Sequence, residues 1–176
     1  IHGFYSNRLE TAVLTKHGFG TSGYFGAIRP RGATVSDGTT ASGSVPVFAG
    51  FCQDMRDVSQ GAQRRGAFAG YFELDGNEFD ELIPYAYANP DDCNIGWCVT
   101  DNFIERLKSQ EPDAVRRFQA SLKLKLTLGI GYYFFTDRVN RAQPYYMPPV
   151  KASNLCSEIT LPANDDLTYT CVLSSM

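Results

Sequence analysis

The chain has 176 residues, close to the length of one domain, and its 43% hydrophobic content is enough for a packed core. Its net charge of -3 argues against a nucleic-acid-binding protein, because such proteins usually show a basic excess or stripe. No apolar run is long enough to span a membrane, and the first residues do not resemble a signal peptide. These properties favour a cytoplasmic protein or, for a virus, one in the host cytoplasm.

The five cysteines are irregularly spaced, which together with the missing signal peptide indicates reduced thiols rather than structural disulfides. Cys93 and Cys98 have no second pair, so no zinc site is expected. We interpret Cys52, Cys93 and Cys98 as packing residues. The two histidines are too few for a metal centre.

The first half of the chain combines two expected helices with two loops rich in small residues. An apolar stripe predicts a helix up to about Lys16, and helical spacing of apolar residues predicts another at 46–58. Residues 17–43 form a Gly-rich region with a short strand at 24–28, and 59–66 form a second loop. Each loop holds a basic pair, which suits one small phosphorylated ligand better than a polyanion.

Strands and helices alternate in the second half, which predicts an α/β architecture with mostly parallel strands. Asn77 and Asp101 are expected to cap helices, and Pro112 to lie near the first turn of a longer one. The expected strands are 67–74, 94–99, 132–135, part of 150–162, and 168–174; the expected helices are 79–87, 103–107 and 112–128.

Residues 153–162 carry the sharpest chemical pattern. In an extended segment, alternation places Asn154, Cys156 and Glu158 on one side, which offers an amide, a thiol and a carboxylate together. Such a trio can hold a polyhydroxyl substrate, abstract a hydrogen from it and move a proton. The alternative is a plain strand with one buried cysteine and two polar neighbours.

The loop at 59–66 has the composition of a nucleotide contact. Small residues let the backbone approach a ligand, while Gln60 and Arg64 can reach a base and a phosphate. A surface turn that ends the 46–58 helix, with solvated arginines, explains the same residues equally well.

The 153–162 segment resembles the finger loop of ribonucleotide reductase large subunits. Other segments resemble this family in the same order. They are the Gly-rich segment 18–32, the second specificity loop 59–67, the strand before the finger loop at 134–140, and the redox-cysteine strand 171–175. The resemblance therefore spans from about residue 16 to the end. It implies a ribonucleoside-diphosphate reductase, an oxidoreductase that makes deoxyribonucleotides for DNA replication.

The resemblance implies a role for each residue of the trio. Cys156 would be the thiyl radical that takes the 3′-hydrogen of the ribose, and Glu158 would accept the proton of the 3′-hydroxyl. Asn154 would hydrogen-bond the ribose hydroxyls. Cys171 would be one of two thiols that reduce the 2′ position and become a redox-active disulfide; the other would lie upstream of Ile1.

The resemblance also implies allosteric control by a dNTP or ATP effector, with the second loop lying between the effector and the substrate base. Either Arg29 or Arg31 would bind effector phosphates. The expected substrate and effector residues are Gly18, Gly20, Arg29, Arg31, Ser59, Gln60, Gly61, Arg64, Arg65 and Ser153.

Leu155 and Ser157 resemble the class that takes its radical from a separate, metal-containing small subunit, because the cobalamin-dependent class more often has Pro and Gly there. The chain itself would bind no metal. Expected partners are the small subunit, a thioredoxin- or glutaredoxin-type reductant, and a second copy of the assembled subunit.

The expected fold is about half of the family's ten-stranded α/β barrel, formed by residues 1–176 as a single segment. Half a barrel leaves strand edges uncovered, so we expect stability only together with other fragments of a split or processed subunit. A silent fragment that only binds nucleotide or scaffolds a complex is the alternative. An unrelated kinase or dehydrogenase lacks support, because neither a Walker motif nor a strand–GxGxxG–helix unit is present.

Overall fold

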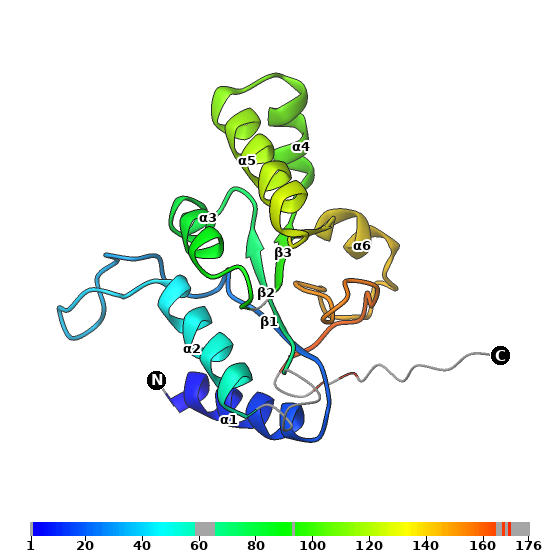
Figure 1. The fold of residues 1–176 in the computed structure, drawn as a ribbon. Coiled ribbons are helices and arrows are strands. Elements are labelled where there is room, and N and C mark those ends of the chain that lie inside the picture. Colours follow the sequence, from blue (N-terminus) through cyan, green and yellow to red (C-terminus); the bar gives the residue numbers. More distant parts are fainter. Residues whose placement is uncertain (1, 59–65, 93, 165–166, 168, 170–176) are drawn as a thin grey trace.

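The computed structural model describes residues 2–58, 66–92, 94–164, 167 and 169. Within these ranges helices and strands alternate along the chain (Figure 1). The elements are α1 (His2–Lys16), β1 (Thr21–Tyr24), α2 (Ser44–Asp57), β2 (Phe68–Glu73), α3 (Phe79–Ala88), β3 (Asn94–Cys98), α4 (Asp101–Lys108), α5 (Pro112–Leu128), β4 (Tyr132–Phe134) and α6 (Thr136–Ala142).

The four strands form one parallel sheet in the order β1-β2-β3-β4. Ser22 pairs with Ala69 and Tyr71 pairs with Gly96, so the register continues across the first three strands. Parallel neighbours need a crossover, and helices supply each of them here. The predicted α/β architecture with a parallel sheet is confirmed.

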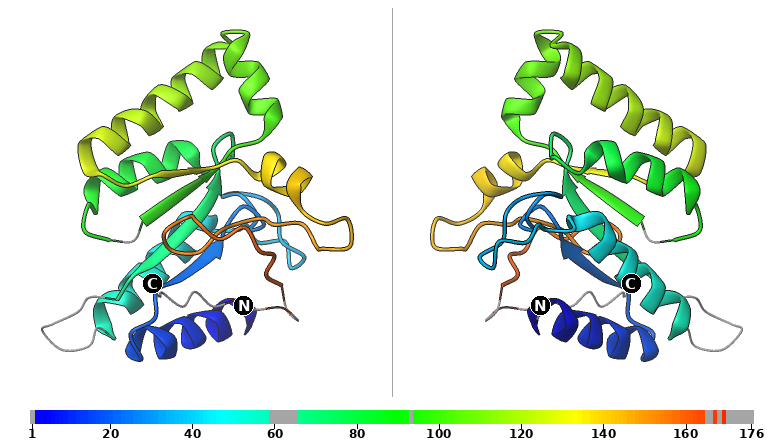
Figure 2. Two further views of the ribbon diagram at one scale, coloured as in Figure 1. Left: turned by 90° about the vertical axis from the view of Figure 1, so that its right-hand side faces the viewer. Right: turned by 90° about the vertical axis from the view of Figure 1, so that its left-hand side faces the viewer.

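One face of the sheet carries the larger core. Phe72, Ile95 and Trp97 point to this face, where they are buried with Phe48 of α2 and Leu124 of α5. Figures 1 and 2 show α2 and α3 lying along this side of the strands. We call it the helix face.

The opposite face, which we call the inner face, is covered by residues 150–164, which we call the finger segment. Tyr71, Cys98 and Phe134 point to it and form a second core with Val150 and Leu155. Figure 1 shows this orange segment on the side of the strands away from α2 and α3. Because both faces are covered, β2 is almost entirely buried, as is usual for a parallel strand.

β1 lies three residues earlier than the strand expected at 24–28. Its pairing with β2 ends at Tyr24, and Phe25 then turns its side chain into the helix-face core. The backbone N–H of Phe25 bonds the Tyr71 carbonyl (2.8 Å), after which the chain turns back on itself at Ile28. Tertiary packing of one aromatic ring thus decides where the strand ends.

The two predicted N-cap positions, for α3 and α4, were each wrong by one residue. Thr100, not Asp101, caps α4 through a hydrogen bond from the Phe103 N–H to its hydroxyl (3.1 Å). Glu78 rather than Asn77 precedes α3, and its side chain makes no cap hydrogen bond. Pro112 does open α5, as predicted.

Two further expectations are corrected. Only Tyr132–Phe134 is a strand in the region before the finger segment, and the residues that follow form the short helix α6. Residues 150–162 contain no strand, because side chains rather than a ladder satisfy their backbone. Most of the strand expected at 168–174 lies outside the described residues.

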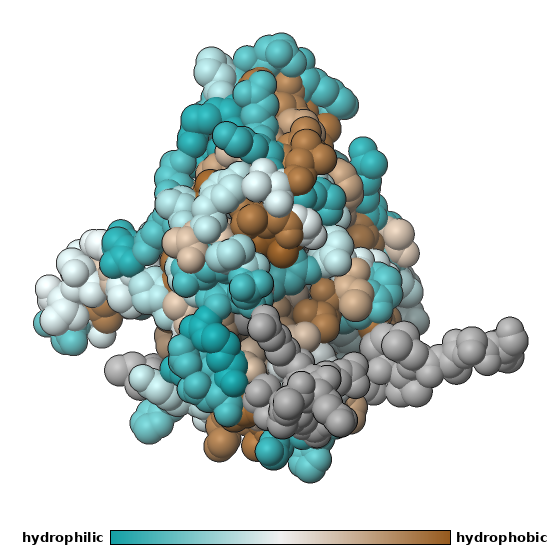
Figure 3. Space-filling view, viewed as in Figure 1, coloured by the Kyte–Doolittle hydropathy of each residue, from teal (hydrophilic) through white to brown (hydrophobic). Residues whose placement is uncertain are grey.

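Several large apolar side chains remain exposed on the described surface. Leu9 of α1 is 67% exposed and Leu126 of α5 is 79% exposed. Figure 3 shows hydrophobic residues in separate patches, one of them along the α4 and α5 pair. The expectation that the chain needs further protein to cover such surface stays a prediction. None of the helices in the described ranges combines the length and the hydrophobicity that a membrane span requires.

Candidate active site

Each of the first three strands contributes one inner-face side chain to hold the finger segment. The Ser22 hydroxyl of β1 donates to the Ser153 carbonyl (2.7 Å), and the Tyr71 hydroxyl of β2 donates to the Asn154 carbonyl (2.6 Å). The Cys98 thiol of β3 donates to the Lys151 carbonyl (3.3 Å). The finger segment is therefore positioned by the sheet itself, one strand after another.

α6 adds a fourth anchor at the start of the segment. The Asn140 side chain accepts from the Val150 N–H (2.7 Å) and donates to the Val150 carbonyl (2.9 Å). This paired bond substitutes for the missing strand ladder, since it satisfies both backbone groups of Val150.

Residues 154–157 form a tight turn. The Ser157 N–H bonds the Asn154 carbonyl (3.2 Å), and Ser157 has a φ of 66°, in the left-handed region that non-glycine residues rarely occupy. The Asn154 side-chain oxygen accepts from the N–H groups of Glu158 and Ile159, both at 3.1 Å. Asn154 therefore closes the turn with its own side chain.

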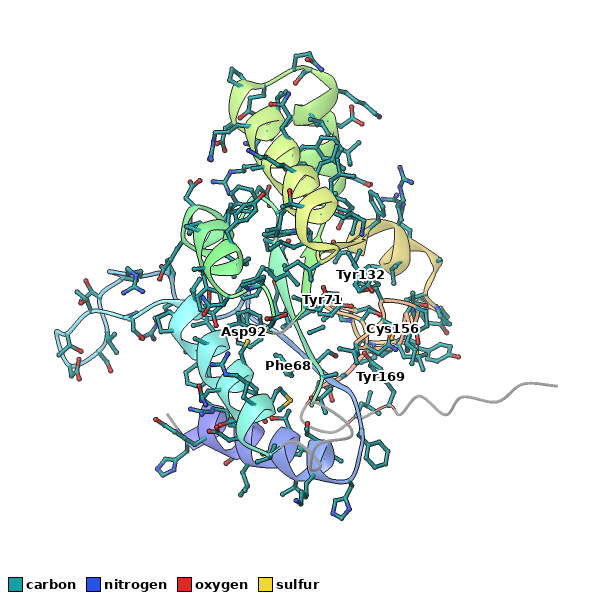
Figure 4. All side chains as sticks on the ribbon, in the orientation of Figure 1. Phe68, Tyr71, Asp92, Tyr132, Cys156 and Tyr169 are labelled. Atoms are coloured by element: carbon teal, nitrogen blue, oxygen red, sulfur yellow. The ribbon has the colours of Figure 1, made fainter. Side chains whose placement is uncertain are left out.

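The same turn brings the amide and the carboxylate together. Since the Asn154 oxygen faces two backbone N–H groups, its amide nitrogen faces Glu158 and donates to Oε1 at 2.7 Å. Cys156 lies between them in sequence, and its side chain is exposed (Figure 4). The prediction that 153–162 gathers these groups on an extended strand was wrong in its geometry, because a turn joins Asn154 to Glu158.

The alternative of a plain strand with a buried cysteine does not fit this geometry. Cys156 is exposed on a turn, whereas Cys52 and Cys98 are buried, as expected of packing residues. Burial raises the pKa of the Cys98 thiol well above its ordinary value, with the nearby Glu73 carboxylate adding to the effect. Cys98 therefore stays protonated, while Cys156 is accessible to a reactant.

The side chain of Ser153 stabilises the turn from within the protein. It is fully buried, and its hydroxyl donates to the Ile159 carbonyl (2.6 Å), which ties the two ends of the turn together.

Tyr169, two residues before Cys171, lies near this region. Burial raises its pKa, a hydrogen bond with Ser22 opposes the shift, and the Glu158 charge adds to it.

The Gly-rich segment meets the finger segment at one point. A Cβ atom on Gly20 would lie 2.5 Å from Leu155 Cδ2, so glycine leaves room for the Leu155 side chain to pack against the Gly-rich segment. Gly18 instead ends α1, with its N–H bonded to the Thr15 carbonyl (2.9 Å). The structure thus brings Gly20, but not Gly18, to the thiol-bearing turn.

The two candidate phosphate ligands differ in their surroundings. Arg31 forms a two-point ion pair with Glu81 of α3, where Nε donates to Oε2 at 2.9 Å. Arg29 is exposed and makes no ion pair within the described part of the chain. The loop that follows, with a bridge between Thr34 and Thr40, projects to the left in Figure 1.

Several expected site residues lie outside the described residues. They are Ser59, Gln60, Gly61, Arg64, Arg65 and Cys171. Within the described ranges, no group of three or more His, Cys, Asp or Glu side chains is arranged to hold a metal ion.

The chain matches a family model described as the ribonucleotide reductase barrel domain, over residues 1–117 and 110–176. The chain belongs to the ribonucleotide reductase family. It is 26% identical over its whole length to a Frog virus 3 (isolate Goorha) chain described as a ribonucleoside-diphosphate reductase large subunit. It is also similar to the class Id ribonucleotide reductase alpha subunit of Actinobacillus ureae, with a TM-score of 0.82 and 33% identity over 94% of this chain.

This ribonucleotide reductase chain spans about a third of the length of those relatives, 34% of the viral chain and 31% of the bacterial one. Its sheet and helices therefore correspond to part of the family's barrel. The expected membership of the ribonucleotide reductase family and the expected α/β barrel fold are both confirmed.

Sequence reasoning missed three residues that hold the site of this ribonucleotide reductase chain in place. They are Ser22, Tyr71 and Asn140, each of which hydrogen-bonds the finger segment from a distant element. No sequence motif marks them. Only the register of the strands shows that Ser22 and Tyr71 share the inner face.

Proposed function

We propose that this chain provides the radical-bearing turn of a ribonucleotide reductase catalytic subunit, which reduces ribonucleotides to deoxyribonucleotides. The observation that carries the proposal is the exposed Cys156 thiol on a turn closed by the 2.7 Å hydrogen bond between Asn154 and Glu158. Within a ribonucleotide reductase barrel, this arrangement supports a site in which one ribose contacts a thiol, an amide and a carboxylate.

In the first step, a thiyl radical on Cys156 takes a hydrogen atom from C3′ of the ribose, forming an S–H bond and leaving a carbon radical. A sulfur radical suits this step because the S–H bond is matched in strength to a ribose C–H bond. Glu158 then takes the proton of the 3′-hydroxyl, and the 2′-hydroxyl leaves as water with a proton from one of the two reducing thiols. Asn154 orients the hydroxyls by hydrogen bonding.

Reduction of the 2′ position needs two electrons and two protons. We propose that Cys171 and a second thiol supply them and form a disulfide, which a thioredoxin- or glutaredoxin-type protein then reduces. Glu158 returns its proton to the 3′-oxygen, and Cys156 finally returns its hydrogen atom to C3′, which regenerates the thiyl radical. The sulfur of Cys156 thus ends each cycle in its starting state.

The radical would come from a separate, metal-containing small subunit, and the remainder of the barrel from other fragments of the same catalytic subunit. An ATP or dNTP effector would bind near the Gly-rich segment and the 59–66 loop. Arg29 is the better candidate for its phosphates, because Arg31 is already paired with Glu81.

The proposal is tested in the chain assembled with the rest of the catalytic subunit and the small subunit, by measuring deoxyribonucleotide formation. Cys156→Ser should abolish turnover, because a serine hydroxyl cannot hold the radical. The matched control is Cys52→Ala, which changes a buried thiol on α2 and should retain activity within a few fold. Full activity of Cys156→Ser would instead favour a scaffolding or nucleotide-binding role.

A further inference from the structure

Tyr71 occupies a fixed position in the centre of the inner face. Its side chain is fully buried, and its ring meets the Phe134 ring edge-on at a centroid distance of 6.0 Å. Its partner in the register is Gly96, where a Cβ atom would come within 2.3 Å of the Tyr71 ring. Gly96 therefore leaves the space that the ring fills, and the ring has little freedom to move.

The Tyr71 hydroxyl lies beneath the thiol-bearing turn. It is 2.6 Å from the Asn154 carbonyl and 2.6 Å from the Ser157 hydroxyl. A phenol has one proton, which goes to the carbonyl, so the Ser157 hydroxyl is the donor in the second bond. The two bonds hold the residues on either side of Leu155 and Cys156, and so fix both ends of the turn.

The bond to Ser157 also compensates for an unfavourable backbone. The left-handed conformation of Ser157, with φ of 66°, is one that non-glycine residues adopt at a cost of about 1–3 kcal/mol. In this conformation its hydroxyl has the buried Tyr71 hydroxyl as its partner. Tyr24, the other tyrosine on the inner face with a described bond, donates instead to Glu73 (2.7 Å) and does not contact the turn.

We propose that Tyr71 is a positioning residue for the Cys156 thiol, holding the turn so that the sulfur meets the ribose carbon at reacting distance. The inference rests on the proposed radical function of Cys156. Hydrogen-atom transfer requires the reacting atoms to be within about 3–3.5 Å, and a displacement of about 1 Å can lower the rate on the order of a hundredfold. A buried phenol on a central strand provides the rigid support that a short exposed turn lacks.

The test compares Tyr71→Phe with Tyr24→Phe in the assembled enzyme. Both variants remove one tyrosine hydroxyl from the inner face and keep the ring, but only the first loses contact with the turn. We expect Tyr71→Phe to lower kcat about 10- to 100-fold with KM within about threefold, and Tyr24→Phe to stay within about threefold in both. A second readout is the alkylation rate of the Cys156 thiol, which should change in Tyr71→Phe alone.

Ser157→Gly supplies a rescue, because glycine adopts the left-handed conformation without a supporting bond. In the Ser157→Gly background, Tyr71→Phe should lower kcat by a smaller factor than in the wild-type background. If Tyr71→Phe does not assemble, Ser157→Ala removes the other partner of the same hydrogen bond and should also lower kcat.

Three results would overturn the inference. They are a Tyr71→Phe variant within twofold of wild-type kcat, equal losses in the two Tyr→Phe variants, or a Ser157→Ala variant as active as wild type where Tyr71→Phe cannot be assembled. An active Cys156→Ser enzyme would overturn the proposed function itself. An inactive Cys156→Ser enzyme with a fully active Tyr71→Phe enzyme would reject only the role of Tyr71.

Discussion

The side-chain amide of Asn154 donates a hydrogen bond to the Glu158 carboxylate at 2.7 Å, across the turn that presents the Cys156 thiol. Its oxygen simultaneously accepts from two backbone N–H groups, so one side chain both builds the turn and orients the carboxylate. Structure and proposed chemistry are therefore coupled at Asn154, and substitutions can separate them.

Glu158→Gln keeps an oxygen that can accept the Asn154 hydrogen bond but removes the group proposed to take a proton. We expect kcat to fall by about 10²- to 10⁴-fold, the usual contribution of a general base, with little change in KM. Steady-state kinetics of the assembled enzyme measure both values. Glu105→Gln on α4, where the exposed Glu105 pairs with Lys108, is the control and should behave as wild type. Unchanged kcat in Glu158→Gln would rule out its role.

Asn154→Asp keeps the oxygen that closes the turn and replaces the amide donor with a second negative charge beside Glu158. We expect the turn to persist and kcat to fall about 10- to 100-fold, because a hydrogen bond to a charged group is replaced by repulsion. Asn154→Ala should lose the turn as well, seen as a changed alkylation rate of Cys156. If the aspartate variant turned over at the wild-type rate, the amide donor would have no function.

Gly20→Ala tests the contact between the Gly-rich segment and the finger segment. The added Cβ would lie 2.5 Å from Leu155 Cδ2, so the Leu155 side chain must move. Cys156 is the next residue in the chain, so its thiol is expected to shift as well. We expect a kcat about tenfold lower with a small loss of stability, since the far end of a side chain can shift. Gly3→Ala on α1, where the new Cβ meets nothing within 4 Å, should have no effect. Equal activities in the two variants would contradict the prediction.

Arg29→Ala and Arg31→Ala should differ in their response to effector. Because Arg31 is paired with Glu81, its removal mainly disturbs the loop that leads to α2. Loss of Arg29 should raise the effector concentration needed for half-maximal stimulation about tenfold, since a charge-assisted contact to phosphate is lost. Titration of activity with each dNTP distinguishes the two variants. A larger shift in Arg31→Ala would reverse the assignment.

Glu73 makes stability depend on pH. One carboxylate oxygen accepts from Tyr24, the other is buried without a hydrogen-bond partner among the described residues, and burial raises the pKa of the group above its ordinary value of 4.5. Between that value and the raised one, the folded state binds more protons than the unfolded state, so stability falls as pH rises.

Glu73→Gln keeps the bond from Tyr24 and carries no charge. At neutral pH the variant should be more stable than wild type by on the order of 1 kcal/mol, because a neutral amide is less costly to bury than a carboxylate. The difference should vanish as pH falls toward 4.5. Thermal unfolding of the assembled subunit across this range measures it, and parallel curves for the two proteins would show that Glu73 does not titrate in this way.

The local sequence pattern of this chain was sufficient to predict much of its fold. Helical spacing placed α1 and α2, and the alternation of strands with helices predicted the parallel sheet. Periodicity and turn chemistry act over a few residues, so they can be read without the rest of the molecule. The same holds for the trio of Asn154, Cys156 and Glu158, because four positions separate the first from the last.

Only the tertiary structure decided how that trio is arranged and supported. The finger segment is not a strand, and its shape depends on hydrogen bonds from Ser22, Tyr71 and Asn140, between 10 and 131 positions away in the chain. Such bonds form only after β1, β2 and α6 have been placed by packing of the whole core. A residue such as Tyr71 acquires its role from the strand register and from the space left by Gly96, and neither is encoded in its immediate neighbours.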